Sequence, residues 1–580
     1  MPIISPRYVL SRKILILAIL VGIVSGLGAL FFYTLLHICS QILLGLAGYS
    51  PPSPAGEKIL IELKINNPFN RLLLIIIPAI GGLISGIIVY SFAPEAEGHG
   101  TDAVIEAYHM KKGFIRGRVP IVKTIASAIT IGSGGSAGRE GPIAQIGAGF
   151  ASYIATKLHL TDREREVLVL CGMSSGIGSI FKSPFGGSLF GIEVLYKRDY
   201  EAEAFIPIII ANFIGYAIFA SIVGWQPIFM TPTYSFSPME LPLFAILGLI
   251  AGLLAKFYVQ VFYDLRDKFF RRITIPNHFK PAIGGLLLGI LAYFIPQCLS
   301  TGYGWIQLAM YGKLALEIMI ILIFAKILAT SFTISSGGSG GVFAPSLVIG
   351  GMLGGVVGLI FKMLFPNIVV EPGIFVLIGM ACFFAGAAKV PLSAIIMVSE
   401  MTGDYNILVP AILASVLSYF ISEEKTIYEK QLGHKAESPV HIPEHIQGLL
   451  YILKVRDVAS PDVILVREDT KLIELEKLIY KSHHLCFPVT NDKGEYVGIV
   501  TLYDVLAIHP SEWDKKTVKE IIKQKFAYVF PDEPLVQAVS KMIQLGLLRL
   551  PVIDYGEKNV VIGEISYDDI IKVLYYKMRE

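Results

Sequence analysis

The sequence has little charge for its length. Of its 580 residues only 16% are charged, 54% are hydrophobic, and the mean hydropathy is +0.63. Soluble globular domains carry charge on about a quarter of their residues. This composition therefore excludes a soluble protein and predicts a polytopic membrane protein. The net charge of +3 is spread too thinly along the chain to indicate nucleic-acid binding.

Cysteine is scarce and widely spaced. The cysteines follow neither a metal-binding spacing nor a disulfide framework, and we expect packing thiols at Cys39, Cys171, Cys298, Cys382 and Cys486. The glycine-rich loops also lack the Gly-Lys-Ser/Thr of a P-loop, which argues against a phosphate-handling enzyme. We therefore expect no enzyme, no catalytic residues, no metal and no required cofactor.

Long apolar runs fill the N-terminal part of the chain. Each has close to the roughly 20 residues that cross a bilayer, and they are Ile14–Leu36, Leu72–Phe92, Phe205–Val223, Leu241–Phe262, Leu316–Phe332 and Val342–Phe365. Shorter pieces such as Cys171–Ile180 and Pro391–Val398 are interrupted by glycine and proline, which predicts discontinuous or re-entrant helices. The basic residues Arg7, Arg12 and Lys13 precede the first run and favour a cytosolic N-terminus.

A ten-residue pattern occurs twice inside apolar sequence. Residues 133–142 and 336–345 both read Ser-Gly-Gly-Ser-x-Gly-x-x-x-Pro, 203 positions apart. A glycine-rich turn that leads into a helix leaves backbone N–H groups unpaired, and these groups attract an anion. Two such turns at membrane depth predict one anion site built by two half-molecules.

The duplication extends beyond this pattern. Matching residues recur 207 positions apart: Gly172-Met173 as Gly379-Met380, Lys182-x-Pro184 as Lys389-x-Pro391, and Glu193 as Glu400. Chance likeness between glycine-rich helices does not explain so many residue types at one offset. We infer two halves, at about residues 70–225 and 240–421.

The composition changes after Ile421. A charged linker at 422–454 leads into a soluble region that is again duplicated, with domains expected at 455–515 and 516–580. Each domain alternates β-branched runs with an amphipathic helix. The expected strands are 463–466, 487–489, 497–501, 527–530, 550–552 and 562–566, and the expected helices are 472–480 and 535–545. The predicted fold is an all-α membrane domain over 1–421 followed by a soluble α+β tandem module.

Three features together resemble the CLC family of chloride channels and proton-coupled chloride exchangers. They are Gly138-Arg-Glu-Gly-Pro142, Gly340-Gly-Val-Phe-Ala-Pro345 and Tyr428. The C-terminal pair resembles cystathionine-β-synthase-type (CBS) domains. This resemblance implies two inverted repeats with broken and re-entrant helices whose N-termini meet at mid-membrane. It also implies a homodimer with one pore per subunit, in the plasma (inner) membrane, with cytosolic CBS domains.

The resemblance also assigns an anion site. Its expected residues are His99, Gly138, Arg139, Glu140, Gly341, Val342, Phe343 and Tyr428. Glu140 matches the gating glutamate, which blocks the pore as an anion and swings away when protonated; a simple helix-capping carboxylate is the alternative. Val342 and Phe343 would offer main-chain N–H groups, unless they only pack after a glycine turn. The Tyr428 hydroxyl would donate to the central anion, the alternative being an interfacial tyrosine.

Two positions depart from the family pattern. His99 lies in Gly98-His-Gly100-Thr-Asp-Ala, where the family usually has Gly-Ser-Gly-Ile-Pro-Glu with the serine hydroxyl on the anion. An imidazole there would make conduction pH-sensitive and alter anion preference; a loop histidine in water is the alternative. Val194 occupies the position of the proton-relay glutamate of exchangers, where channels carry valine. This favours a glutamate-gated, pH- and voltage-sensitive chloride channel over an exchanger with a non-standard proton route.

Other charged residues in apolar surroundings have two interpretations each. Lys123 and Lys182 would raise the positive potential along the anion path. Alternatively, each only neutralises a nearby negative charge or extends its ammonium group towards water. Glu193, the repeat mate of Glu400, is expected to be structural. A CBS-gated cation transporter would need clusters of membrane-embedded acids, and deep acidic residues are few here.

The CBS-like pair contains Thr501-x-x-Asp504 and Ser566-x-x-Asp569, each after a strand and before a helix. In CBS modules such an aspartate binds a ribose hydroxyl of an adenine nucleotide (ATP, ADP or AMP). The same spacing is a helix capping box, and the two roles are compatible. The expected partners are therefore chloride and other small anions, lipid, a second copy of the chain and an adenine nucleotide.

Overall fold

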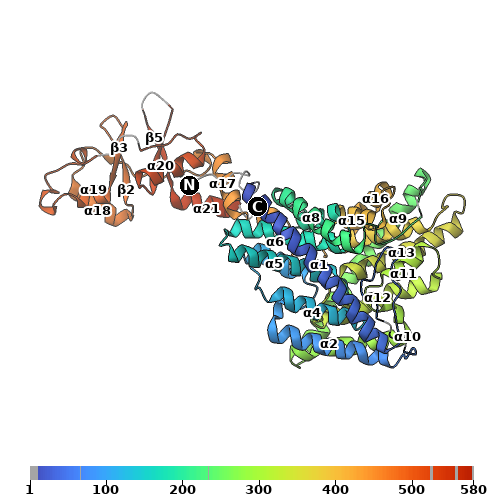
Figure 1. Cartoon of the computed structure of the whole chain (residues 1–580). Coiled ribbons are helices and arrows are strands. Elements are labelled where there is room, and N and C mark those ends of the chain that lie inside the picture. The colour runs from blue at the N-terminus through green and yellow to red at the C-terminus, as the bar shows by residue number, and fades with distance from the viewer. Residues whose placement is uncertain are drawn as a thin grey trace. The chain divides into compact units, whose positions relative to one another are not determined.

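The computed structural model describes residues 11–577 except 64, 66, 233, 523–526 and 556–558, so Arg7 of the basic cluster lies outside it. The chain forms two compact units, Met1–Val440 and His441–Glu580 (Figure 1). We call them the membrane unit and the C-terminal unit. Residues 422–440, expected in the linker, pack with the membrane unit and bring Tyr428 into it.

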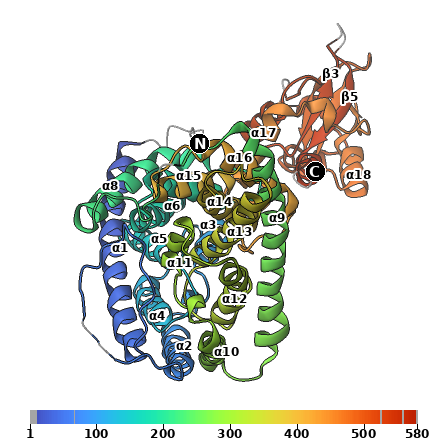
Figure 2. The ribbon, with the colours of Figure 1, turned by 90° about the vertical axis from the view of Figure 1, so that its right-hand side faces the viewer.

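The membrane unit contains six helical stretches of described residues that are long and apolar enough to cross a membrane. Their helices are α1 (Arg12–Leu46), α2 (Leu73–Phe92), α8 (Phe205–Val223), α9 (Leu241–Asp264), α12 (Leu316–Ser335) and α13 (Phe343–Leu364). They coincide with the six apolar runs of the sequence. Figure 2 shows α1 and α9 as long helices on opposite sides of this unit.

The remaining α-helices described in the membrane unit have 8 to 19 residues. They are α3 (Thr101–Met110), α4 (Val119–Gly132), α5 (Glu140–Lys157), α6 (Asp162–Ile180), α7 (Pro184–Glu193), α10 (Lys280–Phe294), α11 (Tyr303–Met310), α14 (Gly373–Ala388), α15 (Pro391–Thr402) and α16 (Leu408–Ile421). With 8 to 10 residues, α3, α7 and α11 are too short to cross a bilayer at about 1.5 Å per residue. Of the interrupted pieces that the sequence predicts as discontinuous helices, Pro391–Val398 lies in the 12-residue α15, whereas Cys171–Ile180 is the second half of the continuous 19-residue α6.

The two halves repeat one another in local detail. Lys182 and Lys389 both adopt a left-handed backbone, with φ of 51° and 60°, in the turn that precedes a proline at the first position of α7 and α15. A proline there suits a helix start because its φ is already helical and its missing N–H is not needed. The α5 and α6 pair corresponds to α13 and α14, and α7 packs against α15.

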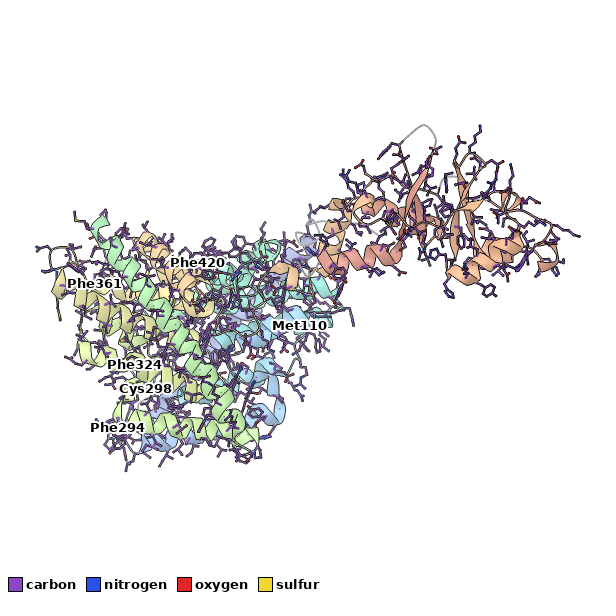
Figure 3. All side chains as sticks on the ribbon, turned by 180° about the vertical axis from the view of Figure 1, so that it is seen from behind. Met110, Phe294, Cys298, Phe324, Phe361 and Phe420 are labelled. Atoms are coloured by element: carbon purple, nitrogen blue, oxygen red, sulfur yellow. The ribbon has the colours of Figure 1, made fainter. Side chains whose placement is uncertain are left out.

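The outer surface of the membrane unit is apolar. Phe294, Phe324 and Phe420 are 70%, 52% and 70% exposed and are labelled in Figure 3. A surface that exposes so many large apolar side chains fits a lipid environment, since water would disfavour it. The cysteines are free, and all but the half-buried Cys39 are buried, as the spacing predicts.

The C-terminal unit contains two similar α/β modules. Its elements are α17 (Ile442–Ile452), β1 (Val466–Arg467), α18 (Leu472–Ser482), β2 (Cys486–Thr490), β3 (Tyr496–Thr501), α19 (Leu502–Leu506), α20 (Leu535–Leu545), β4 (Arg549–Ile553), β5 (Val561–Ser566) and α21 (Tyr567–Lys577). β2 pairs in parallel with β1 and antiparallel with β3, and β4 pairs antiparallel with β5. Burial raises the pKa of the Cys486 thiol to about 11, so it stays protonated at neutral pH.

The first strand of each module is shorter than the sequence predicts. In the first module only the two residues of β1 pair. In the second, pairing is limited to one parallel bridge between Val529 and Val552. Pro531 follows two residues later and has no N–H to extend a ladder, which accounts for the early end.

Candidate anion-binding site

The two copies of the doubled motif meet inside the membrane unit. Gly138 and Gly341 form an isolated antiparallel bridge in which each N–H donates to the other's carbonyl at 2.7 Å. The first glycine of each copy, Gly134 or Gly337, has φ of 105° or 99°, a conformation that side chains disfavour. The bridge places the first residues of α5 and α13 side by side, although 203 residues separate them.

The fourth residue of each motif copy fixes this arrangement. The Ser136 hydroxyl lies 3.0 Å from the Thr330 hydroxyl on α12, and the Ser339 hydroxyl lies 2.9 Å from that of Ser127 on α4. Both contacts cross from one half to the other. The motif serines therefore bind protein rather than the anion.

Glu140 lies at the centre of this junction. It is 2% exposed, and its Oε1 accepts a hydrogen bond from the Phe343 N–H at the start of α13. A side chain on either Gly138 or Gly341 would collide with the carboxylate, so glycine is needed at both positions. The carboxylate thus occupies the N-terminal end of a helix, where an anion is favoured. The Gly138 and Gly341 N–H groups already donate to each other's carbonyl oxygens, so they are not available to the carboxylate.

Aromatic residues enclose the carboxylate. The Phe343 ring packs against Phe181 and Phe384, with centroids 5.0 and 4.6 Å away. Tyr428 is fully buried, with its hydroxyl near that of Thr101. Tyr258 on α9 is also fully buried, with its hydroxyl near that of Ser346. No local pattern in the sequence singles out Tyr258 from other tyrosines in apolar helices.

His99 lies in the loop that leads into α3. The Gly340 N–H donates to the Gly98 carbonyl at 3.2 Å, which ties this loop to the second motif copy. His99 is 8% exposed, its Nε2 is 3.1 Å from Asp102 Oδ2, and its ring centroid is 5.5 Å from that of Tyr428. A cavity of about 520 Å³ reaches both His99 and Asp102. In the sequence, Asp102 is distinguished only as a departure from the family motif, and nothing there indicates its contact with His99.

The buried lysines bind carbonyl oxygens. Lys123 Nζ donates to Ala96 and Gly98 at 2.9 and 2.8 Å, which holds the His99 loop. Its repeat mate Lys326 donates in the same way to Cys298 and Ser300 at 3.0 and 2.7 Å. The repeat offset of 203 would have identified Lys326. Lys182 Nζ likewise donates to the Gly56 and Gln226 carbonyls at 3.2 and 2.9 Å.

Arg139, next to Glu140, has a partner outside the expected set. Its guanidinium forms a buried ion pair with Glu57, from the segment between α1 and α2. The rings of Tyr33, Phe181 and Tyr303 surround it at 5.3–5.5 Å. The pair balances the arginine charge, so Arg139 adds less positive potential to the site than an unpaired side chain would.

Glu193, in the first half, caps a helix of the second half, and Glu400, in the second half, caps a helix of the first. Glu193 accepts from the N–H groups of Leu392 and Ser393 at 3.0 and 2.7 Å, at the start of α15. Glu400 accepts from the Ser183 hydroxyl and the Gly186 N–H at 2.6 and 2.8 Å, at the start of α7. This reciprocal capping is the structural role expected for Glu193. The adjacent Val194 is completely buried.

In the C-terminal unit both S/T-x-x-D sequences form capping boxes. Asp504 Oδ2 accepts from the N–H and hydroxyl of Thr501 at 3.0 and 2.6 Å. Asp569 Oδ2 accepts in the same way from Ser566 at 3.1 and 2.5 Å. The predicted capping is therefore confirmed. The two boxes follow β3 and β5, at equivalent positions of the two modules.

Comparison with known proteins gives the family. Residues 81–423, more than half of the chain, match the voltage gated chloride channel family, abbreviated CLC. The chain belongs to the CLC family. Two further segments, 455–510 and 518–576, each match the CBS domain. This CLC protein therefore has a helical anion-transport unit followed by a CBS pair, as the sequence predicts.

Individual relatives agree with this assignment. The CLC protein is 27% identical to chloride channel protein CLC-f of Arabidopsis thaliana, over 96% of this chain and 80% of the relative. It is 29% identical to the H(+)/Cl(−) exchange transporter ClcA of Vibrio cholerae, over 70% of this chain and 85% of the relative. A slow cyanobacterial Cl⁻/H⁺ antiporter shares the fold, with a TM-score of 0.64, 23% identity and coverage of 72% and 96%. Members of the family are channels and transporters, not enzymes.

Proposed function

We propose that this CLC protein is a chloride-selective channel that conducts passively, is gated by Glu140 and is sensitive to pH and voltage. The observation that carries the proposal is the Glu140 carboxylate bound to the Phe343 N–H between Gly138 and Gly341. A chloride ion needs the same N–H group, so the ionised carboxylate and the anion compete. Protonation removes the carboxylate charge and frees the site. The proposed anion ligands are the Phe343 and Val342 amides, His99 and the Tyr428 hydroxyl. Gly138 and Gly341 leave room for the anion, and Arg139 adds positive potential.

Passive conduction, rather than exchange, is supported by Val194. This side chain is buried and apolar, and Glu193 beside it is fixed by three hydrogen bonds to α15. Neither provides an unoccupied carboxylate for a proton between Glu140 and the far side of the membrane. The relatives include both a chloride channel and an exchanger by name, so this point needs a flux measurement.

We expect a chloride gradient across liposomes to drive chloride flux without uphill proton movement. The measurement records chloride and proton fluxes together from the purified protein. Val194→Glu is the matched variant, because it places a carboxylate at the position that relays protons in exchangers. Uphill proton movement by the unmodified protein would contradict passive conduction, whereas absence of chloride flux would contradict anion transport itself.

We also propose a homodimer in the plasma (inner) membrane, with the N-terminus and the CBS pair in the cytosol. Arg12 and Lys13 at the start of α1 support a cytosolic N-terminus. The exposed apolar side chains on α8 and α16, such as Phe213 and Phe420, support contact with lipid or with a second copy. No nucleic-acid partner is proposed.

We propose that the CBS pair binds an adenine nucleotide and regulates conduction. Asp504 and Asp569 lie at equivalent strand-to-helix junctions, where such an aspartate meets a ribose in CBS modules. We expect calorimetric titration of the full chain with ATP, ADP or AMP to show heat that Asp504→Asn/Asp569→Asn reduces. Asp568→Asn, an exposed carboxylate in the first turn of α21 that belongs to neither capping box, is the control and should leave the heat unchanged. No heat at millimolar nucleotide would contradict the proposal.

A further inference from the structure

Asp102 joins two parts of the anion site. Its Oδ2 lies 3.1 Å from His99 Nε2, on the loop of the first half. Its two oxygens also accept hydrogen bonds from the N–H groups of Glu429 and Lys430, both at 3.1 Å. These residues directly follow Tyr428. One carboxylate on the first turn of α3 therefore positions both His99 and the segment that carries Tyr428.

The closeness of Asp102 favours hydrogen on one particular His99 nitrogen. An ionised carboxylate 3.1 Å from Nε2 repels a lone pair and attracts an N–H, which favours the tautomer with hydrogen on Nε2. The other nitrogen, Nδ1, is buried and has no hydrogen-bond partner among the described residues. The His99 side chain as a whole is 9% exposed. A neutral His99 therefore presents a bare lone pair at Nδ1, and only the protonated ring presents an N–H there.

An anion distinguishes these two states sharply. A lone pair repels chloride, whereas an imidazolium N–H attracts it by charge and by hydrogen bonding. A serine hydroxyl, usual at this position in the family pattern, rotates to donate at any pH. A histidine held by a carboxylate has no such freedom, so it must take up a proton before it can donate.

We propose that Asp102 is a positioning residue that fixes the His99 tautomer, so that each chloride bound at the site is accompanied by one proton bound at His99. The inference rests on the proposed role of His99 as an anion ligand. Because linkage is reciprocal, acid tightens chloride binding and chloride favours the protonated ring. Asp102 itself contacts no anion and acts through His99.

Other ionisable groups lie near His99 or line the cavity that it reaches, and one of them, Glu140, is proposed to compete with the anion. Near His99, besides Asp102, are Lys123, Glu140 and Tyr428, and the cavity is also lined by Glu95, Glu97, Glu106, Lys111, Arg116, Arg266, Arg271 and Lys430. Protonation of Glu140 removes a competing carboxylate, and protonation of His99 adds a donor. Both effects strengthen chloride binding as pH falls, so the two must be separated. Glu140→Gln removes the first and leaves the second.

The test is calorimetric titration of the full-length Glu140→Gln protein with chloride between pH 5.5 and 8.5, in buffers of different ionisation enthalpy. We expect the chloride Kd to rise about tenfold per pH unit at the alkaline end, because one linked proton has that effect. The buffer dependence of the heat should show about one proton taken up per chloride. These values are the reference for three further variants.

Adding Asp102→Asn should make chloride binding nearly independent of pH and abolish proton uptake. The asparagine NH₂ group donates to Nε2 and moves the ring hydrogen to Nδ1, and its oxygen still accepts from the Lys430 N–H, while the Glu429 N–H loses its acceptor. His99→Ser should also bind chloride without proton uptake, and it serves if the Asp102 variant does not fold. Glu106→Gln, on the same helix and paired with Lys111, should leave the uptake unchanged.

The possible outcomes distinguish a failure of the proposed anion transport from a failure of the proton linkage at His99. No chloride binding at any pH in the Glu140→Gln protein would contradict the proposed anion transport. Chloride binding without proton uptake would overturn only the proton linkage at His99. An unchanged proton uptake in the Asp102→Asn or His99→Ser variant would show that another group takes up the proton.

Discussion

Replacing Glu140 with glutamine is expected to open the protein at neutral pH and to remove most of the pH dependence of its anion flux. The amide has the size of the carboxylate but no charge, so its oxygen should compete with chloride for the Phe343 N–H much more weakly. A hydrogen bond to a charged group contributes about 1.5–3 kcal/mol. Its loss should raise chloride flux by about tenfold to a hundredfold at pH 7.5. Flux from liposomes at several pH values measures this.

The matched control is Glu106→Gln, which removes one carboxylate from α3 without touching the gate. Its flux and its pH dependence should equal those of the unmodified protein. In the Glu140→Gln variant, the residual rise in flux with acid should be the part that belongs to His99. A pH dependence as steep as that of the unmodified protein would show that Glu140 is not the gate.

Removing either reciprocal cap is expected to destabilise the membrane unit. Glu193→Ala leaves two N–H groups and the Ser393 hydroxyl of α15 without their acceptor. Each buried donor that is left without an acceptor costs about 1–3 kcal/mol. Glu400→Ala removes the equivalent contacts from α7 but lies in a more exposed position, so its effect should be smaller. Thermal unfolding of the detergent-solubilised protein measures both.

Glu317→Ala is the control for this comparison. Glu317 lies in the first turn of α12 but is exposed, so its removal leaves no buried group unpaired. Its unfolding temperature should stay within the range of the unmodified protein. Glu193→Ala and Glu400→Ala variants as stable as this control would show that the reciprocal caps contribute nothing to the fold.

The sequence predicted the membrane helices and the meeting of the two motif copies, because both depend on local composition. Apolar length alone located the six spanning stretches, and the fixed offsets located the two halves. The capping boxes at Thr501 and Ser566 were also predictable, since a box needs only residues three positions apart. Glu193 was expected to be structural from its repeat mate, although its partners on α15 were not foreseen.

Contacts between distant residues that no internal repeat relates were not predictable. Glu57 pairs with Arg139 across 82 residues, in a segment without any motif. The link from Asp102 to Glu429 spans 327 residues and depends on how residues 422–440 pack against α3. The sequence placed Tyr428 in a linker, because the charge of that segment resembles the linker more than the helices. Its burial is decided by tertiary packing, which composition does not encode.

The bridge between Gly138 and Gly341 has a consequence for the movement of the gate. The two halves share backbone hydrogen bonds beneath Glu140, so they cannot rock apart at this point without breaking both. The motion that remains is rotation of one glutamate side chain. Glu140 is buried, so its rotation lacks the picosecond-to-nanosecond freedom of an exposed side chain. In the proposed gate, opening therefore needs a local side-chain movement in a packed site and no separation of the two halves.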